Sequence, residues 1–132
     1  MEAKTKKPTT VKKEEKVVEE ARNEARATLK YARISARKVK IVADLIRGKN
    51  VDEALAIVKF TPKASSELLE KLLKSAIANA ENNRDMKHEK LYVAEIYAND
   101  GLKMRRYLPR AKGSASGLVK RSSHLTVVLK MR

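Results

Sequence analysis

The sequence of 132 residues contains no cysteine and no tryptophan, and it has only one phenylalanine, three prolines and four glycines. The absence of cysteine excludes disulfide bonds, thiolate metal sites and cysteine nucleophiles, and it is compatible with a reducing cytoplasm. No apolar run reaches the roughly 18 residues of a membrane-spanning helix, and residues 1–16 lack the apolar centre of a signal peptide. We therefore expect a soluble intracellular protein with one modest core.

Acidic residues are few relative to basic ones. The chain carries 31 Lys and Arg against 16 Asp and Glu, which gives a formal net charge of +15. Such an excess opposes compaction unless polyanionic charge lies nearby. The charge therefore predicts a phosphate-rich partner.

The first 24 residues differ in composition from the rest. They mix Lys and Glu, and Val11, Val17 and Val18 supply nearly all of their large apolar side chains. Because so little can be buried, we expect residues 1–24 to form a charged tail that is disordered or weakly helical. Residues 25–132 should form a single domain.

The folded region is predicted to open with a strand followed by a helix. Residues Ala27 to Ile34 alternate apolar and basic side chains, which is typical of a strand. Ser35 is a suitable N-cap for a helix from Ala36 to Arg47, and Gly48 stands where that helix would end in the left-handed conformation. Its apolar and charged side chains repeat at helical spacing on different faces. The apolar face consists of Val39, Val42, Ala43 and Ile46, and the charged stripe of Arg33, Arg37, Lys40, Asp44 and Arg47.

Two further helices are predicted before residue 83. Asn50 with Glu53 resembles a capping box, and it would open a short helix through Phe60. Pro62 suits the first turn of the next helix, from Lys63 to Asn82. That helix has a wide apolar stripe and should supply most of the core.

Two strands are predicted in the second half of the chain. Leu91 to Ala98 is apolar on both faces apart from Glu95, so we expect it to be central or covered. His124 to Met131 alternates as a half-buried strand does, and it should pair antiparallel with Leu91 to Ala98. The expected fold is therefore α+β, with a small antiparallel sheet packed against three helices.

Residues Leu102 to Ser123 would then form a long β-hairpin that protrudes beyond the body. Between Gly101 and Arg132 there are nine Lys or Arg and no acid, while the middle, Pro109 to Gly117, is rich in turn-forming and small residues. A two-stranded ribbon with so few large apolar side chains is marginal alone in water. We therefore expect an anionic surface to support it.

Residues that could carry catalysis are sparse. His88 and His124 fall in different predicted elements, and the isolated glycines make no phosphate-cradling fingerprint. Asp52 and Glu53 are adjacent acids, but negative charge is favourable in the first turn of a helix, which explains their position. We therefore predict no enzymatic activity, no cofactor and no metal site.

Two other classes of protein have to be weighed. Ala36 to Arg47, a turn at Gly48 and Val51 to Phe60 superficially form a helix-turn-helix, which would suit a DNA-binding protein. Its second helix offers Asp52 and Glu53 instead of base-reading side chains, which argues against this alternative. A cationic membrane-surface protein would need bulky apolar residues along a basic helix. The basic stripe could also be an ordinary solvated face.

The chain contains five blocks that read ISARKV (34–39), VADLIRGK (42–49), LKSAIANAE (73–81), PRAKG (109–113) and KRSSHLTVV (120–128). In this order they resemble the bacterial family of large-subunit ribosomal proteins numbered twenty-two. The resemblance covers about Ala25 to Lys130, and five ordered blocks are far more specific than one motif. Residues before Ala25 exceed the family core, and Ser114 stands where the family pattern usually has an arginine.

The resemblance implies a structural constituent of the large subunit that supports assembly and whose hairpin lines the polypeptide exit tunnel. The implied partners are large-subunit (23S) ribosomal RNA, neighbouring large-subunit ribosomal proteins and, near the hairpin tip, the nascent polypeptide. The implied location is the cytoplasmic ribosome, and neither membrane association nor a homo-oligomer is expected. We expect the protein to recognise the shape and the backbone of the RNA, because the major groove of A-form RNA is too deep and narrow for side chains to reach the base edges.

Residues that match the family by position are the expected RNA contacts. They are Arg33, Ser35, Arg37, Lys38, Lys40, Arg47 and Lys49 on the body, and Lys103, Arg105, Arg106, Arg110, Lys112, Lys120 and Arg121 on the hairpin. The hairpin tip would consist of Pro109, Arg110, Ala111, Lys112, Gly113 and Ser114.

Overall fold

The structure, a computed structural model, describes residues 23–132, so nearly all of the predicted tail lies outside the described residues. The chain forms an α+β fold, as predicted. Its elements are β1 (Glu24–Ala32), α2 (Ala36–Ile46), α3 (Val51–Phe60), α4 (Ala64–Arg84), the short 3-10 turn η1 (His88–Lys90), β2 (Leu91–Asp100), β3 (Met104–Pro109), the 3-10 turn η2 (Ala111–Gly113), β4 (Ala115–Lys120) and β5 (Ser123–Met131).

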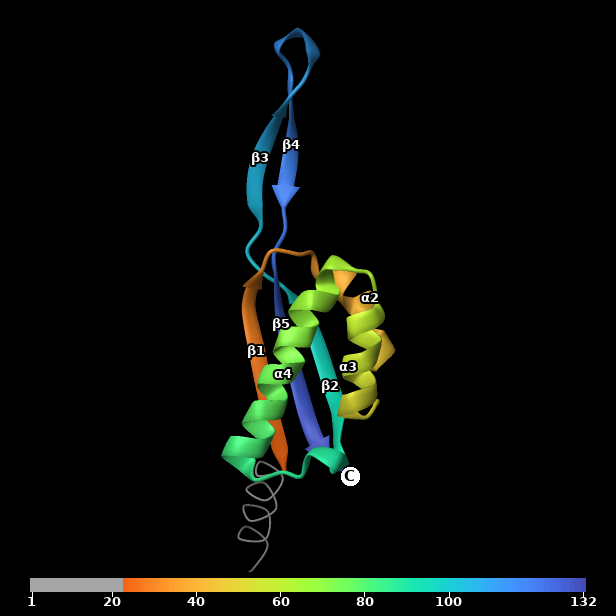
Figure 1. The fold of residues 1–132 in the computed structure, drawn as a ribbon. Helices are drawn as coiled ribbons and strands as arrows, with labels where there is room; N and C mark the ends of the chain where they lie inside the picture. Colours follow the sequence, from red (N-terminus) through yellow and green to blue (C-terminus); the bar gives the residue numbers. More distant parts are fainter. Residues whose placement is uncertain (1–22) are drawn as a thin grey trace, which may run out of the picture.

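Three strands form an antiparallel sheet in the order β1-β5-β2, and the three helices cover one of its faces (Figure 1). The predicted antiparallel pairing of the strand before the hairpin with the strand after it is confirmed. Leu91 to Ala98 was expected to be central or covered; it is not central, because β5 lies between the other two strands, but it is partly covered. Backbone groups of Gly48 and Lys49 bond to Val93, so the outer edge of β2 is partly covered.

A β-bulge explains why β2 looked apolar on both faces. The register with β5 shifts between Val93 and Glu95, so that Val93 and Ile96 point to the same face although they lie three residues apart. On that face three rows of side chains run across the sheet toward the helices. The rows are Ala25, Leu129 and Val93; Ala27, Val127 and Ile96; and Leu29, Leu125 and Ala98.

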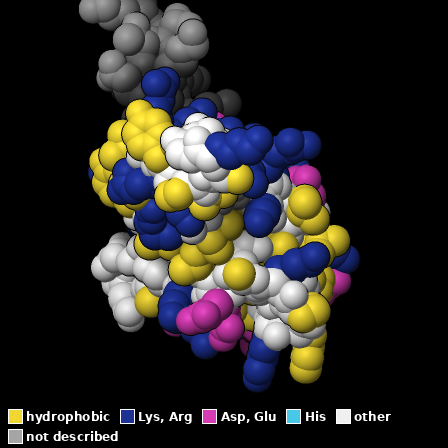
Figure 2. Space-filling model, turned by 90° about the horizontal axis from the view of Figure 1, so that it is seen from above, with side chains coloured by type: hydrophobic (Ala, Val, Ile, Leu, Met, Phe, Trp, Pro, Cys, Tyr) yellow, Lys and Arg dark blue, Asp and Glu magenta, His cyan; other side chains and the backbone are white. Residues whose placement is uncertain are grey.

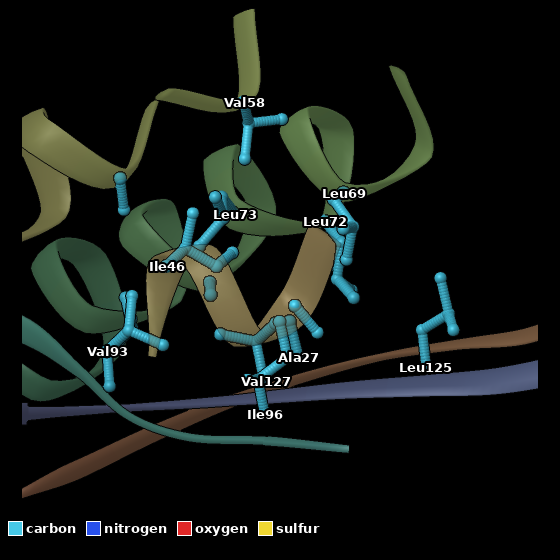
Figure 3. Close-up of a cluster of buried hydrophobic side chains, with 14 of the residues drawn as sticks. Ala27, Ile46, Val58, Leu69, Leu72, Leu73, Val93, Ile96, Leu125 and Val127 are labelled. Carbon is cyan, nitrogen blue, oxygen red and sulfur yellow. The ribbon is translucent and has the colours of Figure 1, made fainter. Parts of the chain in front are cut away.

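The core lies between this face and the helices (Figure 3). Ile46 of α2, Val58 of α3 and Leu69 and Leu73 of α4 are almost completely buried and meet the sheet residue Val127 in one cluster. Burying a Leu or Ile side chain contributes about 1.5–3 kcal/mol. The predicted role of the long helix as main supplier of the core is consistent with its buried stripe, which includes Leu72, Ala76, Ile77 and Ala80.

The helix limits match the predictions closely, but three local details differ. Ser35 and Asn50 precede α2 and α3, yet neither side chain makes a capping hydrogen bond. Glu53 instead pairs with Lys49 at 2.7 Å, so the capping-box prediction is wrong. Pro62 lies before α4, which begins at Ala64, and not in its first turn. Gly48 has the predicted left-handed conformation, with φ of +76°.

The hairpin of β3 and β4 projects from the end of the sheet, away from the helices (Figure 1). Six residue pairs join the two strands, from Met104↔Lys120 to Pro109↔Ala115. None of the side chains between Leu102 and Arg121 is buried. The ribbon therefore has no core of its own, as its composition indicated.

Candidate nucleic-acid interface

The cations of α2 lie on its solvent face because Val39, Val42, Ala43 and Ile46 anchor the opposite face in the core. Arg37, Lys38 and Lys40 are all exposed. Within residues 23–132, no acidic side chain pairs with any of these three. A solvated helix face usually carries ion pairs between neighbouring turns. On α4 these pairs are Glu67–Lys71 and Glu70–Lys74, both at 2.7 Å. The face of α2 thus keeps its positive charge available.

A hollow of about 770 Å³ lies between the start of α2, the end of β2 and the base of the hairpin. It collects five of the predicted contact residues, although Arg121 is more than 80 positions away from the others in sequence. The lining consists of Ser35, Ala36, Arg37, Lys38, Lys40, Ile41, Ala98, Asn99, Asp100 and Arg121. Figure 2, which looks down on the molecule from the hairpin end, shows many more Lys and Arg side chains than acidic ones on this side of the molecule.

Three predicted contact residues are paired with acidic side chains of the protein itself. Arg47 pairs with Asp44 at 2.8 Å and donates a 3.3 Å hydrogen bond to the carbonyl of Ile96. Lys49 pairs with Glu53 at 2.7 Å. Lys103 pairs with Asp100 at 3.2 Å. These cations are less available to a phosphate than those at the start of α2, because each has a local anionic or carbonyl partner.

The remaining hairpin cations are exposed along the ribbon. Arg105, Lys112, Lys120 and Arg121 are exposed, as is Arg33 in the turn before α2. Arg106 bends back, donating a 2.8 Å hydrogen bond to the carbonyl of Arg105. The structure therefore divides the predicted contacts into a cluster around the hollow, a row along the ribbon, and Arg47 and Lys49 near the far end of α2.

The hairpin tip is ordered by its own hydrogen bonds. Arg110 donates through Nε to the Ser116 hydroxyl at 3.1 Å, and the Ser114 hydroxyl donates to the carbonyl of Ala111 at 2.8 Å. Lys112 and Gly113 both have positive φ, 57° and 69°. The Ser114 hydroxyl thus helps to close the tip turn, and this position presents no charge.

The histidines do not form a catalytic arrangement. His88 contacts Asp52 at 3.0 Å and Glu81 at 2.8 Å, and it ties η1 to α3 and α4. The hydrogen bond to Asp52 and then that to Glu81 raise the pKa of His88 above its ordinary value. His124 accepts a 3.0 Å hydrogen bond from the backbone N–H of Tyr31. Over residues 23–132 no group of three metal-ligating side chains occurs, and no helix there is long and apolar enough to cross a bilayer.

Sequence reasoning missed Asn99 and Asp100, which line the hollow beside Arg121. They lie at the end of β2, where they pair with His124 and Ser123 of β5. The only signal available in the sequence was the polar pair directly before Gly101, at the point where the hairpin leaves the sheet. Strand pairing then brings this pair to the base of the hairpin.

A basic α+β body with a cation-lined hollow and a projecting cationic arm has the charge distribution of a nucleic-acid-binding protein. A family model described as ribosomal protein L22p/L17e matches residues 27–130. The chain therefore belongs to the ribosomal protein L22p/L17e family. This assignment confirms the resemblance noted from the five sequence blocks, and it confirms a structural protein and not an enzyme.

Curated relatives match this chain over most of their length. The Large ribosomal subunit protein uL22 of Acetivibrio thermocellus is 54% identical over 121 residues, which cover 92% of this chain and 97% of that protein. That of Caldicellulosiruptor saccharolyticus is 63% identical over 108 residues, 82% of this chain and 88% of the relative. That of Clostridioides difficile is 57% identical over 107 residues, 81% and 96% respectively. These relatives leave the helix-turn-helix alternative without support.

Proposed function

We propose that the chain is a structural constituent of the large ribosomal subunit, that it binds large-subunit (23S) ribosomal RNA, and that it supports assembly. The observation that carries the proposal is the hairpin, which projects beyond the core, buries no side chain between Leu102 and Arg121, and carries only cationic charge from Lys103 onward. An arm of this kind needs an external anionic surface. The names of the relatives, which refer to the large ribosomal subunit, support large-subunit RNA as that surface.

The body is the rigid anchor in this proposal. Arg37, Lys38 and Lys40 stand on a helix whose other face is buried, so their positions are set before RNA binds. Arg121 reaches the same hollow from the hairpin base. Phosphates entering the hollow would meet several cations at once and release condensed counterions. Neighbouring large-subunit proteins are proposed as further contacts of the body.

The hairpin is proposed to line the polypeptide exit tunnel, with the nascent polypeptide passing near its tip. The ribbon's six strand pairs and its self-closed tip suit an element that is held along its flanks and free at its end. Arg105, Lys120 and Arg121 would hold RNA on the flanks. The protein would act within the cytoplasmic ribosome as one copy, with no membrane association, and residues 1–24 are proposed to be a tail outside the RNA-binding domain.

The RNA-binding part is tested by removing the unpaired cations of α2. A triple variant, Arg37→Gln, Lys38→Gln and Lys40→Gln, should weaken binding to large-subunit RNA transcripts and lower the slope of log K against log salt by about 2, because each neutralised phosphate contributes roughly 0.7–0.9. The matched control is Lys59→Gln, Lys71→Gln and Lys74→Gln, which removes the same charge from α3 and α4. Equal losses in both variants would show a general charge effect and contradict an anchor on α2.

The tunnel part is tested by cross-linking. Because the sequence contains no cysteine, Ser114→Cys creates a single attachment point at the tip. In assembled subunits, a cross-linker there should reach the nascent chain or tunnel-lining RNA, whereas one at Ser75→Cys on the exposed face of α4 should not. A tip cross-linker that reaches neither, in subunits that contain the protein, refutes this placement of the hairpin.

A further inference from the structure

Tyr107 is the only Tyr, Phe or Trp between Gly101 and Arg132, and it stands on β3 in the middle of the hairpin. Its side chain is 82% exposed, about twice as exposed as the other large apolar side chains of the two strands, Leu108 at 44%, Leu118 at 40% and Val119 at 44%. An isolated aromatic ring in this position makes almost no contact with its own protein. The ring is therefore available for contact with a binding partner.

The residue opposite Tyr107 leaves a vacant place beside the ring. Tyr107 pairs with Gly117, so both point to the same face of the ribbon. A Cβ built on Gly117 would meet no atom within 4 Å, which means that the tyrosine ring is not folded over the glycine. The vacant place is flanked on the same face by the pairs Arg105↔Val119 and Pro109↔Ala115. We call it the Tyr107 seat.

The charge around the seat selects an anionic partner. Arg105 lies two residues from Tyr107 on the same strand, hence on the same face and about 7 Å away along the strand. It is exposed, and no acidic residue occurs between Gly101 and Arg132. A planar apolar ring beside a cation fits one nucleotide of RNA, whose base stacks on the ring while its phosphate meets the guanidinium.

We propose that the Tyr107 seat holds one unpaired base of the RNA, stacked on the tyrosine ring over Gly117, with Arg105 on the adjoining phosphate. The proposal rests on the RNA-binding function proposed above and names one site within it. The seat adds a contact that salt does not screen, because stacking involves no release of counterions. An aromatic side chain of the nascent polypeptide is the competing occupant, and the uniform positive charge of the ribbon favours the nucleotide.

Four variants of the full chain separate the seat from the rest of the hairpin. Tyr107→Ala removes the ring, and Tyr107→Phe keeps the ring without the hydroxyl. Gly117→Val keeps the ring but fills the vacant place, and the open space at this Cβ lets the fold accept it. Leu108→Ala is the control on the opposite face of the ribbon. Circular dichroism melts establish that each variant is folded.

Binding to large-subunit RNA transcripts should fall about tenfold for Tyr107→Ala and for Gly117→Val, with the salt slope unchanged. Tyr107→Phe and Leu108→Ala should bind as the original chain does. In chemical footprints, a nucleotide protected by the original chain and by Tyr107→Phe should become reactive with Tyr107→Ala.

If all four variants bind equally and leave the footprint unchanged, while the α2 triple variant still weakens binding, the seat is refuted and the RNA-binding function stands. The same pattern, accompanied by nascent-chain cross-links from a position beside Tyr107 that are lost in Tyr107→Ala, would assign the ring to the peptide and also refute the seat. If the original chain shows no preference for large-subunit RNA over duplex DNA at matched salt, the proposed function itself fails.

Discussion

The hydroxyl of Ser122 donates a 2.6 Å hydrogen bond to the carbonyl oxygen of Leu102, and this bond links the two chain segments where the hairpin leaves the sheet. The backbone N–H of the preceding Gly101 donates to the carbonyl of Ser122 at 2.8 Å. Ser122 is almost completely buried. The arm is therefore joined to the body by a tight contact, which sets its direction relative to the α2 hollow.

Gly101→Ala should disturb this joint. A Cβ at Gly101 would lie 2.8 Å from the Ser122 hydroxyl and 3.3 Å from its backbone carbon, so the buried Ser122 side chain or the backbone beside it must shift. We expect a loss of about 1–3 kcal/mol in the free energy of unfolding, which thermal denaturation measures. Gly117→Ala is the matched control in the same hairpin, since its Cβ meets nothing within 4 Å. Equal stability of the two variants would contradict the prediction, because it would show that the contact between Gly101 and Ser122 adjusts without loss of stability.

Stability should depend on pH through His88. Its hydrogen bonds to Asp52 and Glu81 raise its pKa in the folded protein. The stabilisation is therefore fully present below the unfolded pKa and is lost as pH rises through the raised folded pKa. It amounts to no more than about 1 kcal/mol, because these side chains are exposed. Melting temperatures from pH 5.5 to 8.5 should fall more for the original chain than for Asp52→Asn, and parallel curves would contradict the prediction.

The tip should be separable from incorporation into the subunit. Replacing residues 110–114 by Asn-Gly, which suits a two-residue turn, keeps all six strand pairs because the last pair is Pro109↔Ala115. Mass spectrometry of purified large subunits should find the shortened protein at normal stoichiometry, with altered handling of nascent chains. Loss of the shortened protein from the subunits would show that the tip is itself an anchor.

The packing of α4 against the rest of the core should contribute most of the stability of the body. Leu73 is fully buried between α4 and its neighbours, so Leu73→Ala should cost about 2–5 kcal/mol through lost contacts and a residual cavity. Leu45→Ala removes the same side chain from a half-exposed position on α2 and should cost much less. Chemical denaturation compares the two, and similar losses would contradict this layer arrangement.

Several elements could be predicted from the sequence because their causes are local. The apolar spacing in α2 and α4 follows from helix geometry, and Gly48 occupies a conformation that other residues adopt at a cost. The cationic hairpin was visible in the count of seven basic residues and no acid between Leu102 and Ser123. Five ordered blocks also predicted the family, which the family model confirms.

The remaining features depended on long-range packing. The strand order β1-β5-β2 puts β2 at an edge of the sheet, and the bulge between Val93 and Glu95 changes which of its side chains face the core. Nothing in the local sequence pattern marks that shift. Likewise, Asp44 and Ile96 engage Arg47, and His88 joins Asp52 to Glu81. The sequence by itself determined the charge, the helices and the arm, because composition and periodicity are properties of neighbouring residues. Only the tertiary structure decided that Arg121 meets Arg37 at one hollow and that Tyr107 faces Gly117, because strand pairing and helix docking bring distant residues together.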